Sequence, residues 1–402
     1  MKKKTLPVSA AVLLMLLTAV AVFIITYIST YAGLYLNGRG KYAIIDEIDS
    51  LVGRYYLGEI DDDALQDWVA YGYMAGLGDK YGAYMSPEDF DEYMNQMEGQ
   101  GAGLGIRVMY NEENQSIDII AVMPGTPAES AGLLAGDRII GIDNLLISEL
   151  GYENAVNALS GEIGTVHELR IIRGSGTEHP EMLVFNVQIA EYDALTVEYH
   201  MFTGESARKT GIIRIYEFGY KTDEEFIAAV DALIAEGAEQ LVFDLRNNSG
   251  GSLDSVVAML DYLLPEGPVV RITDKNGNVV ETYTSDAENY CDLPMSVLTN
   301  ENSASASELF TSALLDYNKA FTVGTNTYGK GTVLSVFQLS NGGALIISTY
   351  MYNPPFTGNF EGVGIAPGIE VQLPEGTNIY LLDDQTDVQL IRAVEELNLR
   401  AG

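Results

Sequence analysis

The sequence predicts a multidomain α/β protein, in which an N-terminal transmembrane helix precedes a small helical unit, a β module and an α/β core with a mostly parallel sheet. Three observations lead to this fold class. An uncharged stretch opens the chain, the hydrophobic period changes to two near residue 101, and apolar strands alternate with helices from about residue 210. The 402 residues, 47% of them hydrophobic, suffice for two or three cores.

The same features predict five segments along the chain. These are a signal-anchor or transmembrane segment at 1–38, a helical cap or dimerisation unit at 42–98, a β module at 99–190, an α/β core at 191–375 and a helical tail at 376–402.

The first segment has the composition of a membrane anchor. Three lysines at 2–4 precede an uncharged stretch at 5–38, and its most apolar part, 10–28, is about long enough to cross ~30 Å of hydrocarbon as a helix. The lysines favour a cytoplasmic N-terminus, which places the body outside the cytoplasm. Residues 30–32 fit a signal-peptidase site, but the apolar run exceeds a usual signal core, so we favour a retained anchor.

The helical unit shows apolar side chains at helical spacing. The first helix carries Ile44, Ile45, Ile48, Leu51 and Val52, and the second carries Leu65, Trp68, Val69 and Tyr73. The acidic residues at 61–63 are a suitable N-cap for the second helix.

The β module begins at "GAGLGIRV" (101–108). Ile117, Ile119 and Ala121 recur at a period of two, as in a strand with one buried face. Short strands, glycine turns and two short helices then predict a partly open β module.

The core alternates strands with helices. The predicted strands are "TGIIRIYEF", "QLVFDLRNNSGG", "MSVLT", "AFTVGT" and "GALIISTYMY". Strands separated by helices indicate crossovers and a largely parallel sheet. The tail adds an acidic helix whose apolar side would be Val388, Leu390, Ile391 and Val394.

Composition excludes several functions. The net charge of −35 repels phosphate backbones and excludes nucleic-acid binding. The single Cys291 cannot form an internal disulfide. The histidines, which lack metal-ligand spacing, are His167, His179 and His200. The acidic clusters at 61–63 and at Asp383 and Asp384 lack an EF-hand pattern and are interpreted as solvated faces, so we expect no metal and no cofactor.

The stretch "NSASASE" (302–308) allows two interpretations. Ser305 with Glu308 fits a capping box at the start of a helix. Ser305 would also suit a nucleophile, because the positive end of a helix dipole stabilises an alkoxide or oxyanion, but on this stretch alone the cap is the favoured interpretation.

A serine nucleophile needs a base, and no histidine lies near a matching strand end. Lys330, between two glycines in "YGKGTV", follows Ser305 after one predicted helix and one predicted strand, so an α/β layer could return it beside Ser305. Burial would favour the neutral amine that a base requires. The alternative is an ordinary solvated turn lysine.

The glycine pair in "FDLRNNSGGS" (243–252) follows a predicted strand. Backbone N–H groups of Gly250 or Gly251, with that of Ala306, could form an oxyanion hole. The alternative is a turn that requires positive φ.

Together these stretches resemble the C-terminal processing peptidases, the tail-specific Ser/Lys proteases of family S41 with an inserted PDZ domain. "NSASASELF" is similar to their nucleophile stretch, "YGKGTV" to their lysine stretch and "FDLRNNSGG" to their oxyanion segment. "GLGI" and "PGTPAESAGLLAGDRIIGI" resemble a PDZ module. Further similar stretches are "LGDKYGAYMSPEDF" (77–90) and "GIAPGIEV" (364–371), so the resemblance extends from about 42 to 375.

The resemblance implies roles for both modules. Backbone N–H groups of Leu104, Gly105 and Ile106 would bind a substrate's terminal carboxylate, while the tail adds as a strand to the PDZ edge. Ser305 would attack the scissile carbonyl, and Lys330 would take its proton and later give one to the leaving amine.

One residue departs from the family pattern. The family usually has a glutamine four residues after the lysine, and this chain has Leu334. The next glutamine, Gln338, lies roughly 13 Å further along an extended strand and should not replace it. We therefore expect a working dyad with slower turnover.

These observations give a leading hypothesis and an alternative. The leading hypothesis is a membrane-anchored, extracytoplasmic serine endopeptidase that trims protein C-termini. The alternative, prompted by Leu334, is a protease-like PDZ scaffold that binds tails and cuts them weakly or not at all. Either protein could form a homodimer through the helical unit and the acidic tail.

Overall fold

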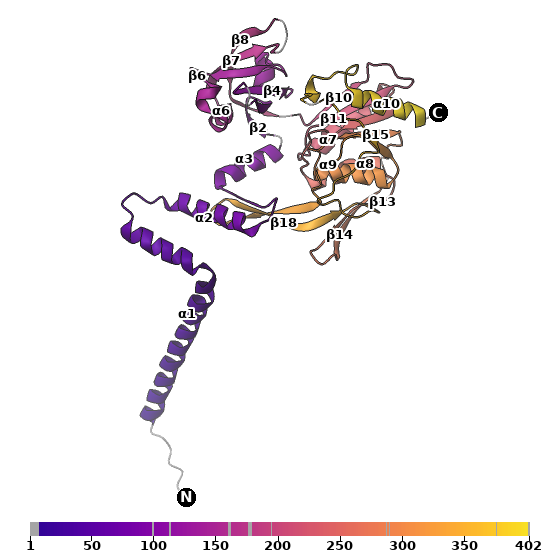
Figure 1. The fold of residues 1–402 in the computed structure, drawn as a ribbon. Coiled ribbons are helices and arrows are strands. Elements are labelled where there is room, and N and C mark those ends of the chain that lie inside the picture. Colours follow the sequence, from indigo (N-terminus) through magenta and orange to yellow (C-terminus); the bar gives the residue numbers. More distant parts are fainter. Residues whose placement is uncertain are drawn as a thin grey trace. The chain divides into compact units, whose positions relative to one another are not determined.

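The computed structural model describes residues 8–98, 100–111, 114–159, 162–175, 179–193, 195–286, 288, 290–374 and 376–400. The chain divides into two compact units, Met1–Val69 and Ala70–Gly402. The first unit holds helix α1 (Val8–Tyr55) and the start of helix α2 (Asp62–Leu77), and the second holds the remaining described elements (Figure 1).

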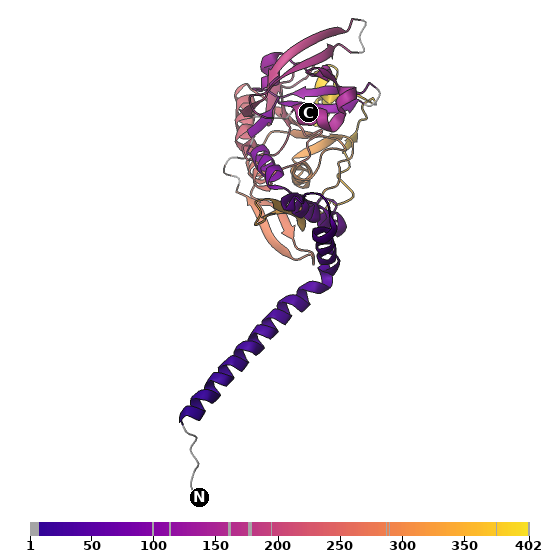
Figure 2. The ribbon, with the colours of Figure 1, turned by 90° about the vertical axis from the view of Figure 1, so that its left-hand side faces the viewer.

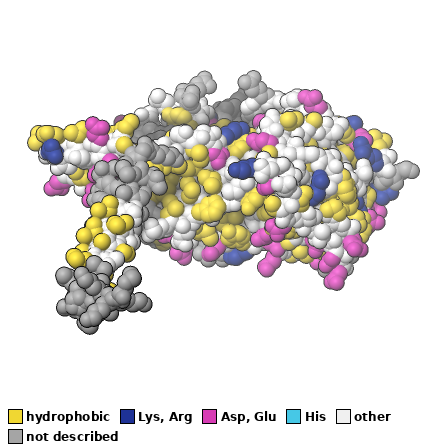
Figure 3. Space-filling view, turned by 90° about the horizontal axis from the view of Figure 1, so that it is seen from below, with side chains coloured by type: hydrophobic (Ala, Val, Ile, Leu, Met, Phe, Trp, Pro, Cys, Tyr) yellow, Lys and Arg dark blue, Asp and Glu magenta, His cyan; other side chains and the backbone are white. Residues whose placement is uncertain are grey.

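Helix α1 is the long indigo helix of Figures 1 and 2. Between residues 15 and 29 its apolar side chains are open to solvent, with Met15 67% and Phe23 71% exposed. Figure 3 shows this helix as a mainly yellow, hydrophobic surface. Over the part of the chain that the structure describes, no helix combines the length and apolarity needed to cross a membrane.

The predicted helical unit contains one strand as well. Helix α3 (Pro87–Met97) follows strand β1 (Ala83–Met85), which the hydrophobic pattern did not reveal. The predicted N-cap of α2 is confirmed, because the Asp61 carboxylate accepts a hydrogen bond from the Ala64 N–H at 3.0 Å.

The β module is an antiparallel sheet in the order β3-β4-β5-β7-β8, with β6 paired to β5. Its strands are β3 (Ile106–Asn111), β4 (Ser116–Val122), β5 (Arg138–Ile142), β6 (Leu145–Leu146), β7 (Val166–Arg173) and β8 (Glu181–Gln188). Its helices are α4 (Pro127–Ala131), α5 (Ile147–Leu150) and α6 (Tyr152–Leu159). Ile117, Ile119 and Ala121 are all buried in its core, which confirms the period of two.

A short ladder joins the entry and exit of this module. Strand β2 (Gln100–Gly103) pairs antiparallel with strand β9 (Ala190–Asp193). Strand β3 lies at the edge of the main sheet, and among the described strands it pairs with β4 alone. Its outer edge therefore presents unpaired backbone groups.

The core contains a six-stranded mixed sheet in the order β10-β11-β12-β15-β16-β19. The strands are β10 (Val197–Met201), β11 (Thr210–Ile215), β12 (Gln240–Asp244), β15 (Met295–Thr299), β16 (Ala320–Gly324) and β19 (Ile369–Glu370). The edge strand β10 pairs antiparallel with β11, and the other pairings are parallel. The predicted mostly parallel sheet is thus confirmed for this sheet.

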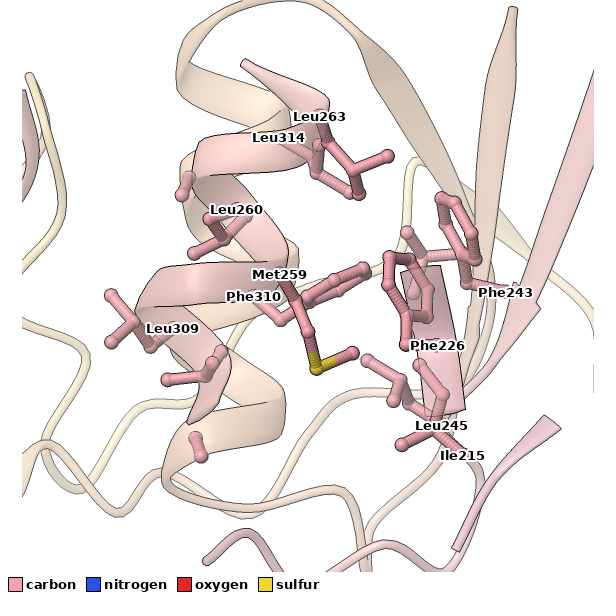
Figure 4. Close-up of a cluster of buried hydrophobic side chains, with 14 of the residues drawn as sticks. Ile215, Phe226, Phe243, Leu245, Met259, Leu260, Leu263, Leu309, Phe310 and Leu314 are labelled. Carbon is pink, nitrogen blue, oxygen red and sulfur yellow. The ribbon is translucent and has the colours of Figure 1, made fainter. Parts of the chain in front are cut away.

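Three helices cover one face of this sheet. They are α7 (Thr222–Ala235), α8 (Leu253–Leu263) and α9 (Ala306–Asp316). Figure 4 shows their apolar side chains meeting those of the strands. The ring of Phe310 on α9 packs edge-on against Phe243 at 5.3 Å and against Phe226 at 6.0 Å. This packing fixes α9, and with it the segment that precedes it, against the sheet.

A second sheet is antiparallel throughout, which corrects the prediction for "GALIISTYMY". Its strands are β1, β13 (Gly267–Thr273), β14 (Val279–Ser285), β17 (Thr332–Gln338) and β18 (Ala344–Asn353). The loop between β17 and β18 is too short for a crossover helix, so the two strands form a hairpin. Strand β1 pairs with β18 on the opposite side from β17.

The tail packs on the other face of the mixed sheet. After a 3-10 turn, η1 (Ile379–Leu381), helix α10 (Val388–Arg400) buries Leu390, Ala393, Val394 and Leu397. Val388 is exposed, contrary to the predicted apolar side.

Asp384 is also buried, contrary to the predicted solvated face. Its carboxylate accepts hydrogen bonds from the N–H and hydroxyl of Thr203 at 2.7 and 2.8 Å and contacts His200. These partners compensate for its burial.

Candidate active site

Ser305 lies at the junction between β15 and α9 in a strained conformation. Its φ of 57° is in the left-handed region, which is unfavourable for a residue with a side chain, and it is 7% exposed. Its N–H donates to the Glu308 carboxylate at 2.9 Å, but its side chain makes no cap hydrogen bond. Half of the expected capping box is therefore present, and the hydroxyl is not used to cap the helix.

The hydroxyl of Ser305 lies against Tyr352 of β18 instead. Tyr352 is 4% exposed, and burial raises its pKa to about 12, an effect that the hydrogen bond from the Ser305 side chain partly opposes. Sequence reasoning missed this neighbour, because Tyr352 belongs to a strand that was expected in the other sheet.

Glu308 links the serine to the lysine segment. It is fully buried, and besides the Ser305 N–H it accepts hydrogen bonds from the Thr327 hydroxyl at 2.5 Å, the Gly329 N–H at 2.7 Å and the Lys330 N–H at 2.8 Å. Four donors satisfy a buried carboxylate well. The sequence suggested only a capping role for this residue.

Lys330 is partly buried beside three carboxylates. Burial lowers the pKa of its amine, whereas the negative charges of Glu361, then Asp79 and Glu308, oppose that shift. Lowering the pKa increases the fraction of neutral amine, which a general base requires. Within the described residues the Lys330 amine makes no hydrogen bond to the Ser305 hydroxyl.

Ser305 and Lys330 line one cavity of about 550 Å³. Its apolar wall includes Met85, Phe218, Val333, Leu334, Val336 and Ile346. The two predicted catalytic side chains thus face a common space, although their roles stay predictions. Polar side chains, among them Glu217, Asp254 and Thr332, share this wall with the apolar ones. A cavity that combines an apolar lining with polar groups is typical of a substrate site.

The glycine pair lies directly behind the serine. A Cβ built on Gly250 would lie 2.8 Å from the Ser305 Cβ and 3.0 Å from the Ala306 nitrogen. The Gly250 N–H already donates to the Asn248 side chain at 2.9 Å. This favours Gly251, rather than Gly250, as the partner of Ala306 in an oxyanion hole.

The departure from the family pattern is visible in β17. Leu334 contributes an apolar side chain to the cavity wall. Gln338 is exposed at the end of the strand, where it pairs with Ala344. Gln338 therefore lies away from the cavity, as its spacing predicted.

The predicted carboxylate-binding loop of the β module precedes strand β3. Leu104 is buried, and its carbonyl accepts a hydrogen bond from the Ala128 N–H at 2.9 Å. Gly105 has a φ of 75°, and a Cβ there would lie 2.2 Å from the Thr126 Cβ. Leu104 and Gly105 therefore form the loop that leads into β3, whose first residue is Ile106.

Among the described residues no group of three or more histidine, cysteine or acidic side chains could hold a metal ion.

Comparison with protein families matches both modules. The family model for peptidase family S41 matches residues 209–371, and the PDZ domain model matches residues 94–169.

Named relatives agree with these matches. A carboxyl-terminal-processing protease of Picosynechococcus is 30% identical over 325 residues, which cover 81% of this chain and 77% of the relative. A carboxy-terminal-processing protease of Bartonella bacilliformis is 32% identical over 343 residues, which cover 84% and 76%.

Two solved structures share the fold. The photosystem II D1 C-terminal processing protease superposes with a TM-score of 0.52 at 23% identity, covering 87% of this chain and 89% of that one. A putative S41 protease from Bacteroides fragilis superposes with a TM-score of 0.62 at 17% identity, covering 86% and 99%.

Proposed function

Because the chain belongs to peptidase family S41 and contains a PDZ domain, we propose that it cleaves proteins near their C-terminal tails with Ser305 as nucleophile and Lys330 as base. One observation supports the pair above all. The two side chains line one cavity, and the buried Glu308 carboxylate holds the backbone of both residues at once.

The proposed reaction follows acyl-transfer chemistry. The neutral Lys330 amine takes the proton of the Ser305 hydroxyl as its oxygen bonds to the scissile carbonyl carbon. The N–H groups of Gly251 and Ala306 stabilise the oxyanion. The Lys330 ammonium then gives its proton to the leaving amine, and water hydrolyses the acyl-enzyme by the reverse proton movements.

The PDZ domain would select the chain end. The substrate's terminal carboxylate binds the N–H groups at Leu104, Gly105 and Ile106, and the tail pairs with the open edge of β3. Main-chain pairing explains how tails of different sequence could be accepted.

The N-terminal segment would act as a membrane anchor, with the catalytic part outside the cytoplasm. The proposal is supported by the uncharged stretch at 5–38 and by the solvent-exposed apolar side chains between residues 15 and 29. Membrane flotation of the full chain tests it: the protein should rise with vesicles, and recovery in the soluble fraction would refute retention.

A homodimer through the helical unit is supported by exposed apolar side chains there. Ile44 is 73% exposed and Trp68 is 73% exposed, which suits coverage by a second chain. Light scattering of the chain should give twice the monomer mass, and a monomer would contradict the assembly.

The experiment for the function is cleavage of a protein with an apolar C-terminal tail. The wild type should shorten it, and both Ser305→Ala and Lys330→Ala should lose this activity. Cleavage that survives in both variants would defeat the proposed chemistry. The scaffold alternative would instead require that the wild type does not cleave this protein and that the Leu334→Gln variant does.

A further inference from the structure

The wall beside Lys330 is built by a segment far from it in sequence. Residues 79–81, within the stretch "LGDKYGAYMSPEDF", precede strand β1. The Lys330 amine lies 5.1 Å from the centre of the Tyr81 ring, and both side chains line the catalytic cavity. At this distance the amine lies against the ring face in the geometry of a cation–π contact.

Tyr81 is tied to the lysine segment through a carboxylate. Its hydroxyl donates to Glu361 at 3.2 Å, and the other oxygen of Glu361 accepts the N–H of Gly331 at 2.7 Å. Asn359 holds the other side of Gly331, because its amide donates to the Gly331 carbonyl at 2.7 Å and its oxygen accepts the Glu361 N–H at 2.7 Å. The residue after Lys330 is therefore clamped at both its N–H and its carbonyl.

Asp79 fixes the Tyr81 segment to the antiparallel sheet. Its carboxylate accepts hydrogen bonds from the N–H and hydroxyl of Ser348 on β18, at 2.8 and 2.9 Å, and from the Tyr81 N–H at 3.1 Å. The pairing of β1 with β18 adds a second attachment. The ring is thus held by a rigid element.

The carboxylates around the amine are already occupied by other donors. Glu308, Asp79 and Glu361 each accept at least two hydrogen bonds from other groups, which hold their carboxylates in place. Leu334 offers no polar atom at the position where the family usually has an amide. On the side formed by residues 79–81, the Tyr81 ring and Glu361 limit where the Lys330 amine can lie.

We propose that Tyr81 and Glu361 are positioning residues that aim the Lys330 amine at Ser305, in place of the amide that Leu334 lacks. This inference rests on the proposed Ser305–Lys330 chemistry. The Tyr81 ring limits where the amine can lie, and Glu361 fixes both the ring and the backbone that follows the lysine.

The Glu361 charge acts on the lysine pKa directly, because it favours the ammonium. The face of the Tyr81 ring also attracts an ammonium that lies over it. The other charged or titratable groups near the amine are Asp79, Glu308 and Lys80, whose amine lies 4.9 Å from the centre of the Tyr81 ring. Those elsewhere on the cavity wall are Tyr93, Glu217, Tyr220, Asp254 and Tyr352.

Shifts of a pH profile therefore test the proposal. The rate at which a fluorophosphonate reagent labels Ser305 is measured from pH 5 to 10 on the full chain, because labelling needs the neutral amine but no natural substrate. In Glu361→Gln, which keeps the side-chain shape, the acid limb of the profile should move to lower pH by about one pH unit, because a charge that favours the ammonium is lost. In Tyr81→Leu the acid limb should also move to lower pH, by roughly half a pH unit or more, because the ring face that attracts the ammonium is lost while the site stays apolar.

A positioning role also predicts a fall in the maximal rate. Both variants should lower the plateau labelling rate at least about tenfold, with the reagent's half-saturating concentration within twofold of wild type. Tyr199→Leu, which removes an exposed tyrosine on β10, is the matched control and should leave the profile unchanged. Thermal unfolding of each variant reports whether the fold is retained.

The outcomes separate this inference from the function on which it rests. Acid limbs that stay in place, or that move to higher pH, in the folded variants overturn the positioning role while leaving the dyad intact. If Tyr81→Leu does not fold, Glu361→Gln and Tyr81→Phe test the positioning role instead. Loss of the Tyr81 hydroxyl alone should lower the plateau labelling rate of Ser305. A wild type that is not labelled at Ser305 overturns both proposals.

Discussion

The buried carboxylate of Glu308 offers a direct test of how the catalytic segments are held together. One oxygen accepts hydrogen bonds from the Ser305 and Lys330 N–H groups, and the other accepts them from the Thr327 hydroxyl and the Gly329 N–H. The substitution Glu308→Gln keeps the shape but replaces one oxygen with an NH₂ group. Whichever oxygen is replaced, two buried donors lose their acceptor.

The expected magnitude follows from those two donors. An unsatisfied buried donor costs about 1–3 kcal/mol, so the free energy of unfolding should fall by about 2–6 kcal/mol. The donors belong to the segments that carry the serine and the lysine. Because a misplacement of about 1 Å can cost on the order of a hundredfold in rate, we expect the labelling rate of Ser305 to fall by at least that factor.

Urea unfolding and fluorophosphonate labelling measure the two effects. Glu301→Gln is the control, since its exposed carboxylate accepts one hydrogen bond, from Thr325, and its loss should change the free energy of unfolding by less than about 0.5 kcal/mol. A Glu308→Gln protein with wild-type stability and a wild-type labelling rate would refute the reasoning.

Three further predictions concern the core and the two loops. Burial alone would raise the pKa of Asp244, but the guanidinium groups of Arg246 and Arg214 hold that pKa far below its usual range. Ionised Asp244 therefore stabilises the folded protein above about pH 4, and this contribution is lost as the pH falls. Acid titration of unfolding should show that Asp244 contributes a loss of roughly 2 kcal/mol between pH 4 and pH 2, so the total loss over this window should be smaller by about that amount in Asp244→Asn. Gly250 has a φ of 108°, and an alanine Cβ there would press against the Ser305 Cβ. Gly250→Ala should therefore lower the free energy of unfolding in urea by about 1–3 kcal/mol and slow the labelling of Ser305. Unchanged labelling would contradict the close packing. Gly105→Ala would clash with Thr126 and should abolish binding of a tail peptide in calorimetry while Ser305 labelling continues; retained affinity would argue against this loop.

The sequence predicted those parts of the fold that depend on local pattern. The alternation of Ile117, Ile119 and Ala121 identified a strand with one buried face, and Asp61 identified the start of a helix. It also placed Ser305 and Lys330 at the ends of neighbouring strands, because the strand and helix order fixes which loops meet at one edge of a parallel sheet.

The remaining features depend on contacts between distant segments. Tyr81 reaches the catalytic lysine because β1 adds to β18, a pairing that no local pattern encodes. The role of Glu308 was underestimated for the same reason, since three of its four donors come from the segment at 327–330. A capping pattern describes only the partner within its own helix.

The most direct test of the central claim is the rate of Ser305 labelling in Lys330→Met, with the site of the adduct identified by mass spectrometry. The substitution keeps an unbranched side chain in the cavity but removes the amine. We predict a single adduct on Ser305 in the wild type and a labelling rate at least about a hundredfold lower in the variant. A variant labelled at the wild-type rate, or a wild-type adduct on another residue, would contradict the Ser305–Lys330 chemistry.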